Sequence, residues 1–339
     1  MTTGLFALDT AIKVVVVLAA MLSGALVVIF AELKIGAHMQ HRPGPYYAGG
    51  RFGWAQPLAD GLKFLQKEDL VPNGADSRVF RAAPYLVVSA TLATFVVIPF
   101  GPDLVVRDLD LGVFYLLAIS SITTLGVLMA GWASANKYSL IGGLRAAAQL
   151  IAYELPLLLA AVAVVVQAGT MSLNGIVEAQ AETFITVGSF DISVPFLLKG
   201  QLIGFAIFMI AAVAELSRIP FDMPIAESEL TMGYLTEYSG IRFTMFFLGE
   251  YLAIISMAAV AATLYLGGYW APFIPENLLN AAGPLILGAK VALLVFIIIW
   301  IRWTWPRLRE DQLQDMAWRW LIPLALANIV IAGIFKVAF

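Results

Sequence analysis

One stretch of the chain, AELSRIPFDMPIAESELTMGYLTEYSG at residues 214–240, gathers acids between two long apolar segments. Its single base is Arg218, and its acids are Glu215, Asp222, Glu227, Glu229 and Glu237. Carboxylates crowded together at low dielectric repel one another, which raises some of their pKa values towards neutrality and suits them to carry protons. The residue types therefore predict proton transfer, and the surrounding elements must place the acids where protons can reach them.

The spacing before Pro220 predicts how this stretch begins. Pro220 disfavours helical geometry at Ile219, so we expect the preceding helix to end there. Glu215 and Arg218 are three residues apart, which would put them on one face of the last helical turn, where they could form an ion pair.

A second, shorter helix is expected after the proline. Leu230, Tyr234 and Tyr238 recur every four residues, which is typical of an amphipathic helix. Glu227 and Glu229 are two residues apart and cannot point the same way on such a helix. We expect one of them to face a cavity and the other a polar path inward.

Four acids lie within or at the ends of segments that are otherwise apolar: Glu32, Glu154, Glu215 and Glu250. A charged residue at the centre of a bilayer costs about 2.5–3.5 kcal/mol on insertion scales, so such residues usually face the protein interior or water and serve ion or proton transfer. Each acid by itself could instead be a neutral or ion-paired structural residue. The four together favour a proton path.

The composition defines the elements that must position these acids. The chain has 339 residues, of which 61% are hydrophobic and 13% charged, and its mean hydropathy is +0.88. A soluble core cannot bury so much apolar surface, so lipid must be the solvent. Apolar runs of about 20 residues, the length that crosses the hydrocarbon layer, predict an all-α polytopic membrane protein. We expect a single membrane domain over residues 1–339 with eight spans, near 11–32, 80–100, 112–134, 146–167, 199–219, 243–267, 285–305 and 318–337.

Loop charge predicts the orientation of the chain, because Lys and Arg accumulate on the cytoplasmic side. We expect both termini on the outer face and residues 214–240 in the third cytoplasmic loop. The bases of the first, third and fourth cytoplasmic loops form a docking surface for a soluble partner, or they reflect topology alone. The odd-numbered loops and their helix edges contain Lys34, Arg42, Arg51, Lys63, Lys67, Arg78, Arg81, Lys137, Arg145, Arg218, Arg242, Arg302, Arg307, Arg309 and Arg319, and the even-numbered ones contain Arg107, Lys199 and Lys290.

The first cytoplasmic loop predicts a helix that lies on the membrane surface. In WAQPLADGLKFLQKED the apolar residues Trp54, Leu58, Leu62 and Leu65 recur at helical spacing, and the charged residues lie off that stripe. The preceding HRPGPYYAGGRFG is rich in Gly and Pro, so it is either a loop that wraps a ligand or partner, or a simple linker.

The composition also constrains redox and metal chemistry. The chain has no Cys and only two His, His38 and His41, so it cannot hold an iron–sulfur cluster through thiolates or form internal disulfides. The two histidines lack carboxylate or thiolate neighbours in a ligand pattern, and we expect them to be structural or interfacial, with no metal site. Nothing in the sequence suggests nucleic-acid binding. Any redox centre must belong to a partner.

Four blocks of sequence, in order and nearly spanning the chain, resemble one protein family. ELSRIPFDMPIAESELTMGYLTEYSG resembles the pattern ETNRxPFD…ExE…GYxxEYSG of the H subunit of bacterial NADH–quinone oxidoreductase (respiratory complex I), the counterpart of mitochondrial NADH dehydrogenase subunit 1. GPYYAGGRFGWAQPLADGLKFLQKED, GGLRAAAQLIAYELPL and WPRLREDQLQDMAWRWLIPLALAN resemble its GPNRxGPxGxxQxxADGxKxxxKE, LRxxAQxISYE and PRxRxDQLMxxxWKxxLPLxLxN.

The resemblance implies a membrane subunit of a proton-translocating enzyme in the bacterial inner membrane. The chain would anchor a hydrophilic arm, whose subunits carry the terminal iron–sulfur cluster, and would itself hold no metal, flavin or cluster. It would form much of the chamber for a quinone's isoprenoid tail, a role that the resemblance assigns to Arg42, Asp60, Phe64, Arg218, Phe221 and Asp222. An acidic funnel would pass protons or charge changes to antiporter-like and small membrane-arm subunits, a role assigned to Glu154, Glu215, Glu227, Glu229 and Glu250.

The sequence departs from the family patterns at four positions. Leu33 stands where an arginine is usual, Tyr46 and Ser217 where an asparagine is usual, and Ile225 where an acid is usual.

Two alternative functions stay open at this point. The related anchor subunit of membrane-bound hydrogenase-type complexes has the same architecture and does not need a quinone. A free-standing ion-coupled transporter would also have eight spans with buried acids. Retention of most chamber residues favours the quinone-reducing complex.

Overall fold

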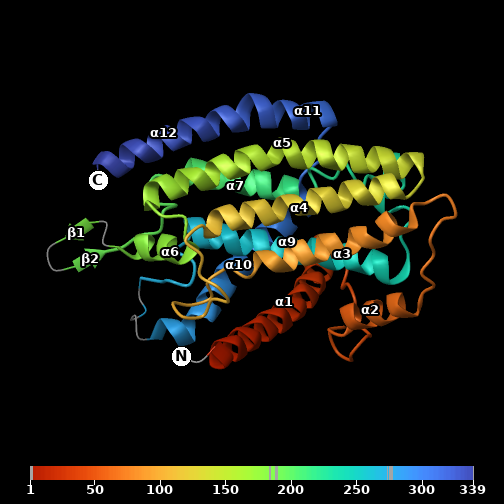
Figure 1. Ribbon diagram of the computed structural model, residues 1–339, viewed down its shortest axis with the longest axis horizontal. Helices are drawn as coiled ribbons and strands as arrows, with labels where there is room; N and C mark the ends of the chain where they lie inside the picture. The colour runs from red at the N-terminus through yellow and green to blue at the C-terminus, as the bar shows by residue number, and fades with distance from the viewer. Residues whose placement is uncertain (1–2, 183–184, 188–189, 273, 275–277, 339) are drawn as a thin grey trace.

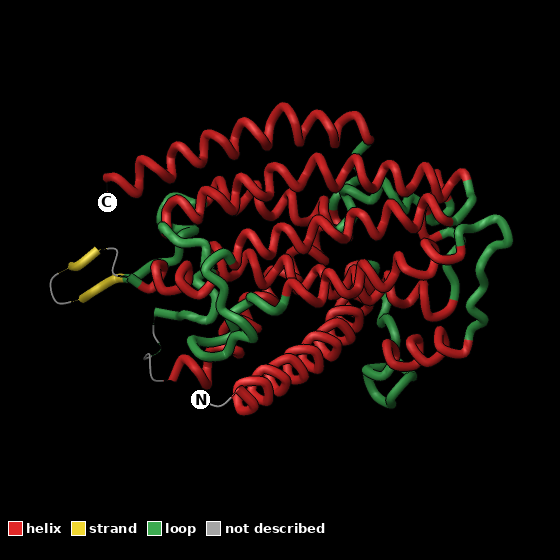
Figure 2. Tube along the Cα trace, in the orientation of Figure 1, coloured by secondary structure: helices red, strands yellow, loops and turns green. Residues whose placement is uncertain are grey.

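The computed structural model describes the chain except for residues 1–2, 183–184, 188–189, 273, 275–277 and 339. The long helices lie alongside one another in a bundle, and a small β-hairpin projects from one end (Figures 1 and 2). In the hairpin, β1 (Ile185–Val187) pairs antiparallel with β2 (Phe190–Ile192). The helices are α1 (Thr3–Met39), α2 (Gln56–Gln66), α3 (Ser77–Thr94), α4 (Gly112–Ala133), α5 (Lys137–Ala168), α6 (Leu173–Ala181), α7 (Leu202–Glu215), α8 (Glu227–Leu230), α9 (Gly240–Tyr265), α10 (Leu279–Thr304), α11 (Glu310–Asp315) and α12 (Ile322–Ala338), with a 3-10 turn η1 (Gly233–Leu235) and a π-helical turn η3 (Met316–Leu321).

The predicted polytopic helical architecture is confirmed, and each of the eight predicted spans falls on a helix. Among the described residues, six helical segments are long and apolar enough to cross a membrane, and α7 is a shorter apolar helix. α3, over the second predicted span, contains two arginines and several hydroxyl residues, which lower its hydropathy. The six segments are Thr10–Met39, Gly112–Ala133, Lys137–Ala168, Gly240–Tyr265, Leu279–Thr304 and Glu310–Val337.

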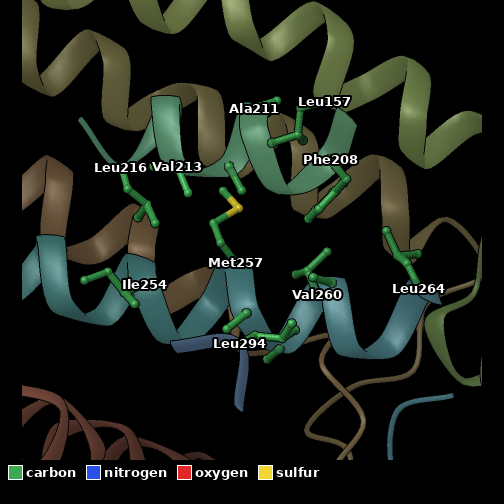
Figure 3. Packing of buried hydrophobic residues seen from close by; sticks show 14 of the residues in the cluster. Leu157, Phe208, Ala211, Val213, Leu216, Ile254, Met257, Val260, Leu264 and Leu294 are labelled. Atoms are coloured by element: carbon green, nitrogen blue, oxygen red, sulfur yellow. The ribbon is translucent and has the colours of Figure 1, made fainter. Parts of the chain in front are cut away.

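α9 forms the centre of the bundle. Every residue from Ile254 to Tyr265 is buried, because this half of the helix is rich in alanine and its small side chains let neighbouring helices approach closely. Figure 3 shows Val213 and Phe208 of α7 pointing towards Met257 and Val260 of α9. The helices at the periphery, such as α1 and α12, expose apolar side chains instead, as expected where lipid is the solvent.

A lysine of α10 binds backbone carbonyls at the C-terminal end of α9 and in the turn that follows. The Lys290 ammonium donates hydrogen bonds to the carbonyls of Leu266, Gly268 and Trp270 at 2.7, 2.8 and 2.6 Å. Carbonyls at the C-terminal end of a helix have no intrahelical partner, and a cation is favourable there. α10 is therefore fastened to the end of the central helix.

α1 begins and α12 ends at the same end of the bundle, which is also the end with the hairpin, whereas α2 lies at the opposite end (Figure 1). This arrangement agrees with the prediction that both termini lie on one side of the membrane. Their placement on the outer face stays a prediction.

Candidate functional site

The helical path of the chain is interrupted between α7 and α9. α7 ends at Glu215, earlier than the predicted Ile219, and Ser217 takes a left-handed conformation with φ of 50°. The Ile219–Pro220 peptide bond is cis. The predicted Glu215–Arg218 ion pair is wrong, because residues three apart no longer share a face once the chain leaves the helix at Ser217. Arg218 pairs instead with the carboxylates of Glu32 and Glu250.

The prediction of a single amphipathic helix through Leu230 and Tyr238 is also wrong. Thr231 and Gly233 have positive φ values of 63° and 56°, so the chain forms the short α8, a break and the η1 turn. Tyr238 leaves the expected helix face. Its ring stacks on Phe80 of α3 with 4.1 Å between centroids, which fastens the end of the segment to the bundle.

A buried ion cluster centres on Arg218, whose side chain is 3% exposed. Its Nη1 lies 2.7 Å from both carboxylate oxygens of Glu32 at the end of α1. Its Nε lies 2.6 Å from the Glu250 carboxylate of α9, and its guanidinium lies over the Tyr251 ring. Arg302 of α10 forms a second ion pair with Glu32. Side chains of three helices therefore meet around one arginine of the interrupted segment.

A cavity adjoins this cluster at Glu250, and its lining combines apolar and polar residues. It leaves about 80 Å³ for the centres of water-sized molecules, which is room for several waters. Glu215 and Glu250 both line it, and Glu215 Oε2 is buried with no hydrogen-bond partner among the described residues. Thr94 and Ser256 hydrogen bond to each other across it at 2.6 Å. Other polar residues of the lining are Thr91, Ser120, Thr123, Ser217 and Tyr234.

Glu154 continues this acidic series on α5. Its side chain, like that of Glu215, is partly buried, and α5 packs against α7. Of the predicted funnel residues, Glu250 and Glu215 line one cavity, and Glu154 lies on the neighbouring helix.

Asp222 lies just beyond the interruption and is partly buried. Burial raises the pKa of Asp222 to about 6, and Arg307 and Arg218 limit the rise by favouring its charged form. The charges of Glu250 and Glu227 act on it in the opposite sense. Of the predicted chamber residues, the structure places Arg218, Phe221 and Asp222 together.

Glu227 and Glu229 lie at the surface and are exposed. Glu229 accepts a hydrogen bond from Arg145 of α5 at 2.8 Å and pairs with Arg307 at 3.3 Å. The Arg145 hydrogen bond lowers the pKa of Glu229. This carboxylate thus links α8, α5 and the segment before α11, and it borders a charged surface depression that also includes Arg309 and Glu310.

The other three predicted chamber residues lie around α2. Asp60 pairs with Lys63 at 3.3 Å and accepts hydrogen bonds from Gln56. The Phe64 ring packs on Phe243 of α9 with 5.5 Å between centroids. Arg42 is exposed and bonds Gln40. Among the described residues, no hydrogen bond or ion pair joins Arg42 or Asp60 to Asp222.

The helical prediction for the first cytoplasmic loop is confirmed by α2. Its apolar stripe of Leu58, Leu62 and Leu65 is exposed, as is Trp54 just before the helix. This is the surface that a helix in the interface plane turns towards lipid.

Sequence reasoning misses several residues of the site. It names no partner for Glu32, yet Glu32 pairs with both Arg218 and Arg302. It also groups Arg302 with the topological charges. The hydroxyls of the cavity carry no distinctive spacing. The only sequence signal for the ion cluster is the presence of arginines at the ends of spans that also contain buried acids.

The chain matches known proteins over nearly its whole length. The sequence model of the NADH dehydrogenase family matches residues 12–333. A relative from Syntrophobacter fumaroxidans, named as the second H subunit of NADH-quinone oxidoreductase, is 46% identical over 331 residues, which cover 95% of this chain and 94% of the relative.

Two Bacillus relatives are named as the H subunit of NADH-quinone oxidoreductase. The protein of Bacillus cytotoxicus is 45% identical over 311 residues, and that of Bacillus mycoides is 45% identical over 316 residues. Each alignment covers 92% of this chain and 89% of the relative. The similarity therefore includes α2, the interrupted segment and all the helices that surround it.

Proposed function

Since the chain belongs to the NADH dehydrogenase family and is a membrane subunit of NADH-quinone oxidoreductase, we propose that it forms part of the quinone chamber and couples quinone reduction to proton translocation. The relatives' names favour this function over the hydrogenase-type anchor and the transporter. In this proposal the chamber is built from Arg42, Asp60, Phe64, Arg218, Phe221 and Asp222. Electrons stay in hydrophilic-arm subunits that carry the terminal iron–sulfur cluster.

The observation that supports the proposal is that Glu250 contacts both the ion cluster and the cavity. It pairs with Arg218 on one side and lines the cavity on the other. A change of charge in the chamber alters the field at Arg218, and the arginine shares its positive charge between Glu32 and Glu250. Through Arg218, a charge change in the chamber reaches Glu250, which the proposal makes the first member of the proton path.

From Glu250 the proton path continues through the cavity to Glu215. The unpartnered Oε2 of Glu215 is free to accept a hydrogen bond from water. A proton on Glu215 changes the electrostatic environment of Glu154 on the neighbouring α5, and Glu154 would pass the change to antiporter-like and small membrane-arm subunits. Glu227 and Glu229 lie at the exposed surface, where the hydrophilic arm would dock, and both chain termini would lie on the outer face of the inner membrane.

Two of the departures from the family pattern lie in the cavity wall. Ile225 lines it where the family usually has an acid, so the path here depends on Glu215 and Glu250 at that point. Ser217 lines it as well and has positive φ, a conformation in which asparagine is favoured over most residues. This preference gives a backbone reason for the usual asparagine.

Replacing Asp222 by Asn tests the chamber directly. We expect NADH-driven quinone reduction in membranes to fall by at least about tenfold, because the variant cannot exchange a proton, whereas electron transfer from NADH to an artificial acceptor that bypasses the quinone should be unchanged. Glu227→Gln tests the exposed end of the proposed proton path in the same assay. The matched control is Asp311→Asn, an exposed acid that pairs locally with Arg309. Unchanged quinone reduction in an assembled Asp222→Asn complex would remove Asp222 from the chamber.

The pH dependence of quinone binding follows from the raised pKa of Asp222, about 6. An apolar quinone tail excludes more water and disfavours the carboxylate further, so binding favours the protonated form. By linkage the KM for quinone should be lowest below pH 6 and should rise above it, by no more than about tenfold per pH unit. Initial rates with varied quinone from pH 5 to 8 measure this slope. In Asp222→Asn the rise should be absent, and its persistence would assign the titration to another group.

A further inference from the structure

Gln149 joins the two sides of the interruption after α7. It lies on α5, and 2% of the residue is exposed. Its amide nitrogen donates to the carbonyl of Ala214 at 2.7 Å and to the carbonyl of Phe221 at 2.8 Å. Ala214 belongs to the last turn of α7, and Phe221 is followed by Asp222. A single side chain therefore holds both ends of the turn from Ala214 to Phe221.

The orientation of the Gln149 amide follows from its neighbours. Both partner atoms are carbonyl oxygens, which only accept hydrogen bonds, so the NH₂ group and not Oε1 must face them. Oε1 is then buried with no partner among the described residues. A buried acceptor without a partner is unfavourable, and the two donated bonds offset that cost.

The segment held in this way contains Arg218. Within the segment, the Phe221 N–H donates to the Arg218 carbonyl at 2.7 Å. The Leu308 N–H, from the chain before α11, donates to the Pro220 carbonyl at 3.0 Å and holds the middle of the turn. The two Gln149 bonds hold both ends of the turn against α5.

α5 holds Phe221 at a second point. The Tyr153 ring, one helical turn after Gln149, packs on the Phe221 ring with 5.2 Å between centroids, and its hydroxyl donates to the Leu313 carbonyl of α11 at 2.9 Å. One face of α5 thus fixes the backbone and the ring of the residue that precedes Asp222.

We propose that Gln149 is a positioning residue for quinone reduction. Its amide binds the carbonyls of Ala214 and Phe221 and so fixes the position of Asp222 relative to Arg218. This inference rests on the proposed function of the chamber. Gln149 touches no reacting atom. Its contribution is geometric, because displacements of about 1 Å can cost up to about 100-fold in rate when they misalign reacting groups.

Three variants separate hydrogen-bond donation from packing. Gln149→Met keeps the length of the side chain and removes both donors. Gln149→Glu keeps the shape, but a carboxyl group buried beside two carbonyls is protonated and has one O–H, so it can donate to only one of them. Gln149→Asn keeps the amide on a shorter stem that can reach one carbonyl. The matched control is Gln201→Met, because Gln201 is also a buried amide, 1% exposed, that bonds Gln167 and Asn328 away from the interruption.

The measurement is the KM and kcat for a short-chain quinone in membranes, with artificial-acceptor activity and native gels as checks of assembly. We expect the KM to rise by about 10- to 100-fold in the Met variant and less in the Glu and Asn variants, with a smaller change in kcat and normal acceptor activity. Gln201→Met should retain the quinone KM of the native protein. A KM within about twofold of native in assembled Gln149→Met, below the scale of misalignment effects, would overturn the proposal.

Three further outcomes complete the test. If no Gln149 variant assembles while Gln201→Met does, Gln149 serves folding and the positioning role is wrong. If Gln149→Met has native kinetics but Asp222→Asn abolishes quinone reduction, only this inference fails and the chamber stands. If Asp222→Asn also has native kinetics, the proposed function fails with it.

Discussion

Replacing Arg218 by Met is expected to abolish stable assembly of the chain into its complex. Arg218 is buried and pairs with Glu32 and Glu250 at 2.7 and 2.6 Å. Removing one partner of a buried ion pair leaves an uncompensated charge, which costs about 3–5 kcal/mol out of the roughly 5–15 kcal/mol that stabilise a typical domain. Arg302 still neutralises Glu32, so the stranded charge is mainly that of Glu250. Native gels of membranes and the midpoint of thermal disassembly measure the effect.

A double variant distinguishes charge balance from function. Arg218→Met combined with Glu250→Gln removes both the base and the stranded acid, so assembly should largely recover while quinone reduction stays low. Arg309→Met is the matched control, since Arg309 is 80% exposed and pairs only with Asp311 among the described ion pairs, and it should assemble normally. Native assembly and quinone reduction in the single Arg218→Met variant would show that the ion cluster is dispensable.

Gly233→Ala should displace the segment from α8 to η1 and prevent a functional site from forming. A Cβ at Gly233 would lie 1.7 Å from the Pro224 carbonyl oxygen, and the residue has φ of 56°. The positive φ costs an alanine of the order of 1–3 kcal/mol, and the clash is with backbone, which cannot rotate away. Because Tyr234 lines the cavity, the displacement would reach the proton path. Limited proteolysis of the assembled complex, together with quinone reduction, measures the change.

Gly50→Ala is the control that isolates the clash. Gly50 also has a positive φ, 81°, but nothing lies within 4 Å of the Cβ it would gain. Both variants carry the conformational cost, and only Gly233→Ala carries the steric one. Equal effects of the two substitutions would mean that backbone strain alone matters and that the close approach to Pro224 does not.

The helices could be predicted because lipid imposes a simple rule on the sequence. Each span must be a run of apolar residues long enough to cross the hydrocarbon layer with its backbone satisfied internally, so the runs coincide with α1, α4, α5, α9 and α10. The residue at which a helix begins or ends depends instead on local capping interactions. α5 begins at Lys137, well before the predicted residue 146, because the Asn136 side chain caps it by accepting from the Tyr138 N–H.

The acids of the site could be predicted for the same reason, since a carboxylate in an apolar run requires an explanation. Their partners could not. The spacing of Glu215 and Arg218 indicated a pair, but that reasoning assumes an unbroken helix, and the left-handed Ser217 turns Arg218 away. The role of Gln149 is equally invisible in the sequence, because the carbonyls it binds belong to residues 65 and 72 positions further along the chain.

The sequence by itself determined that this protein crosses the membrane many times, that its carboxylates cluster near Pro220, that thiolate-held redox centres are absent, and which family it resembles. These properties depend on residue types and on spacings within one element. Only the tertiary structure decided that Glu32 and Glu250 share Arg218, that hydroxyls from α3, α4 and α9 line one cavity, and that α5 clasps the interrupted segment. Each of these contacts joins helices distant in sequence, and their proximity is set by the packing of whole helices, which no local pattern encodes.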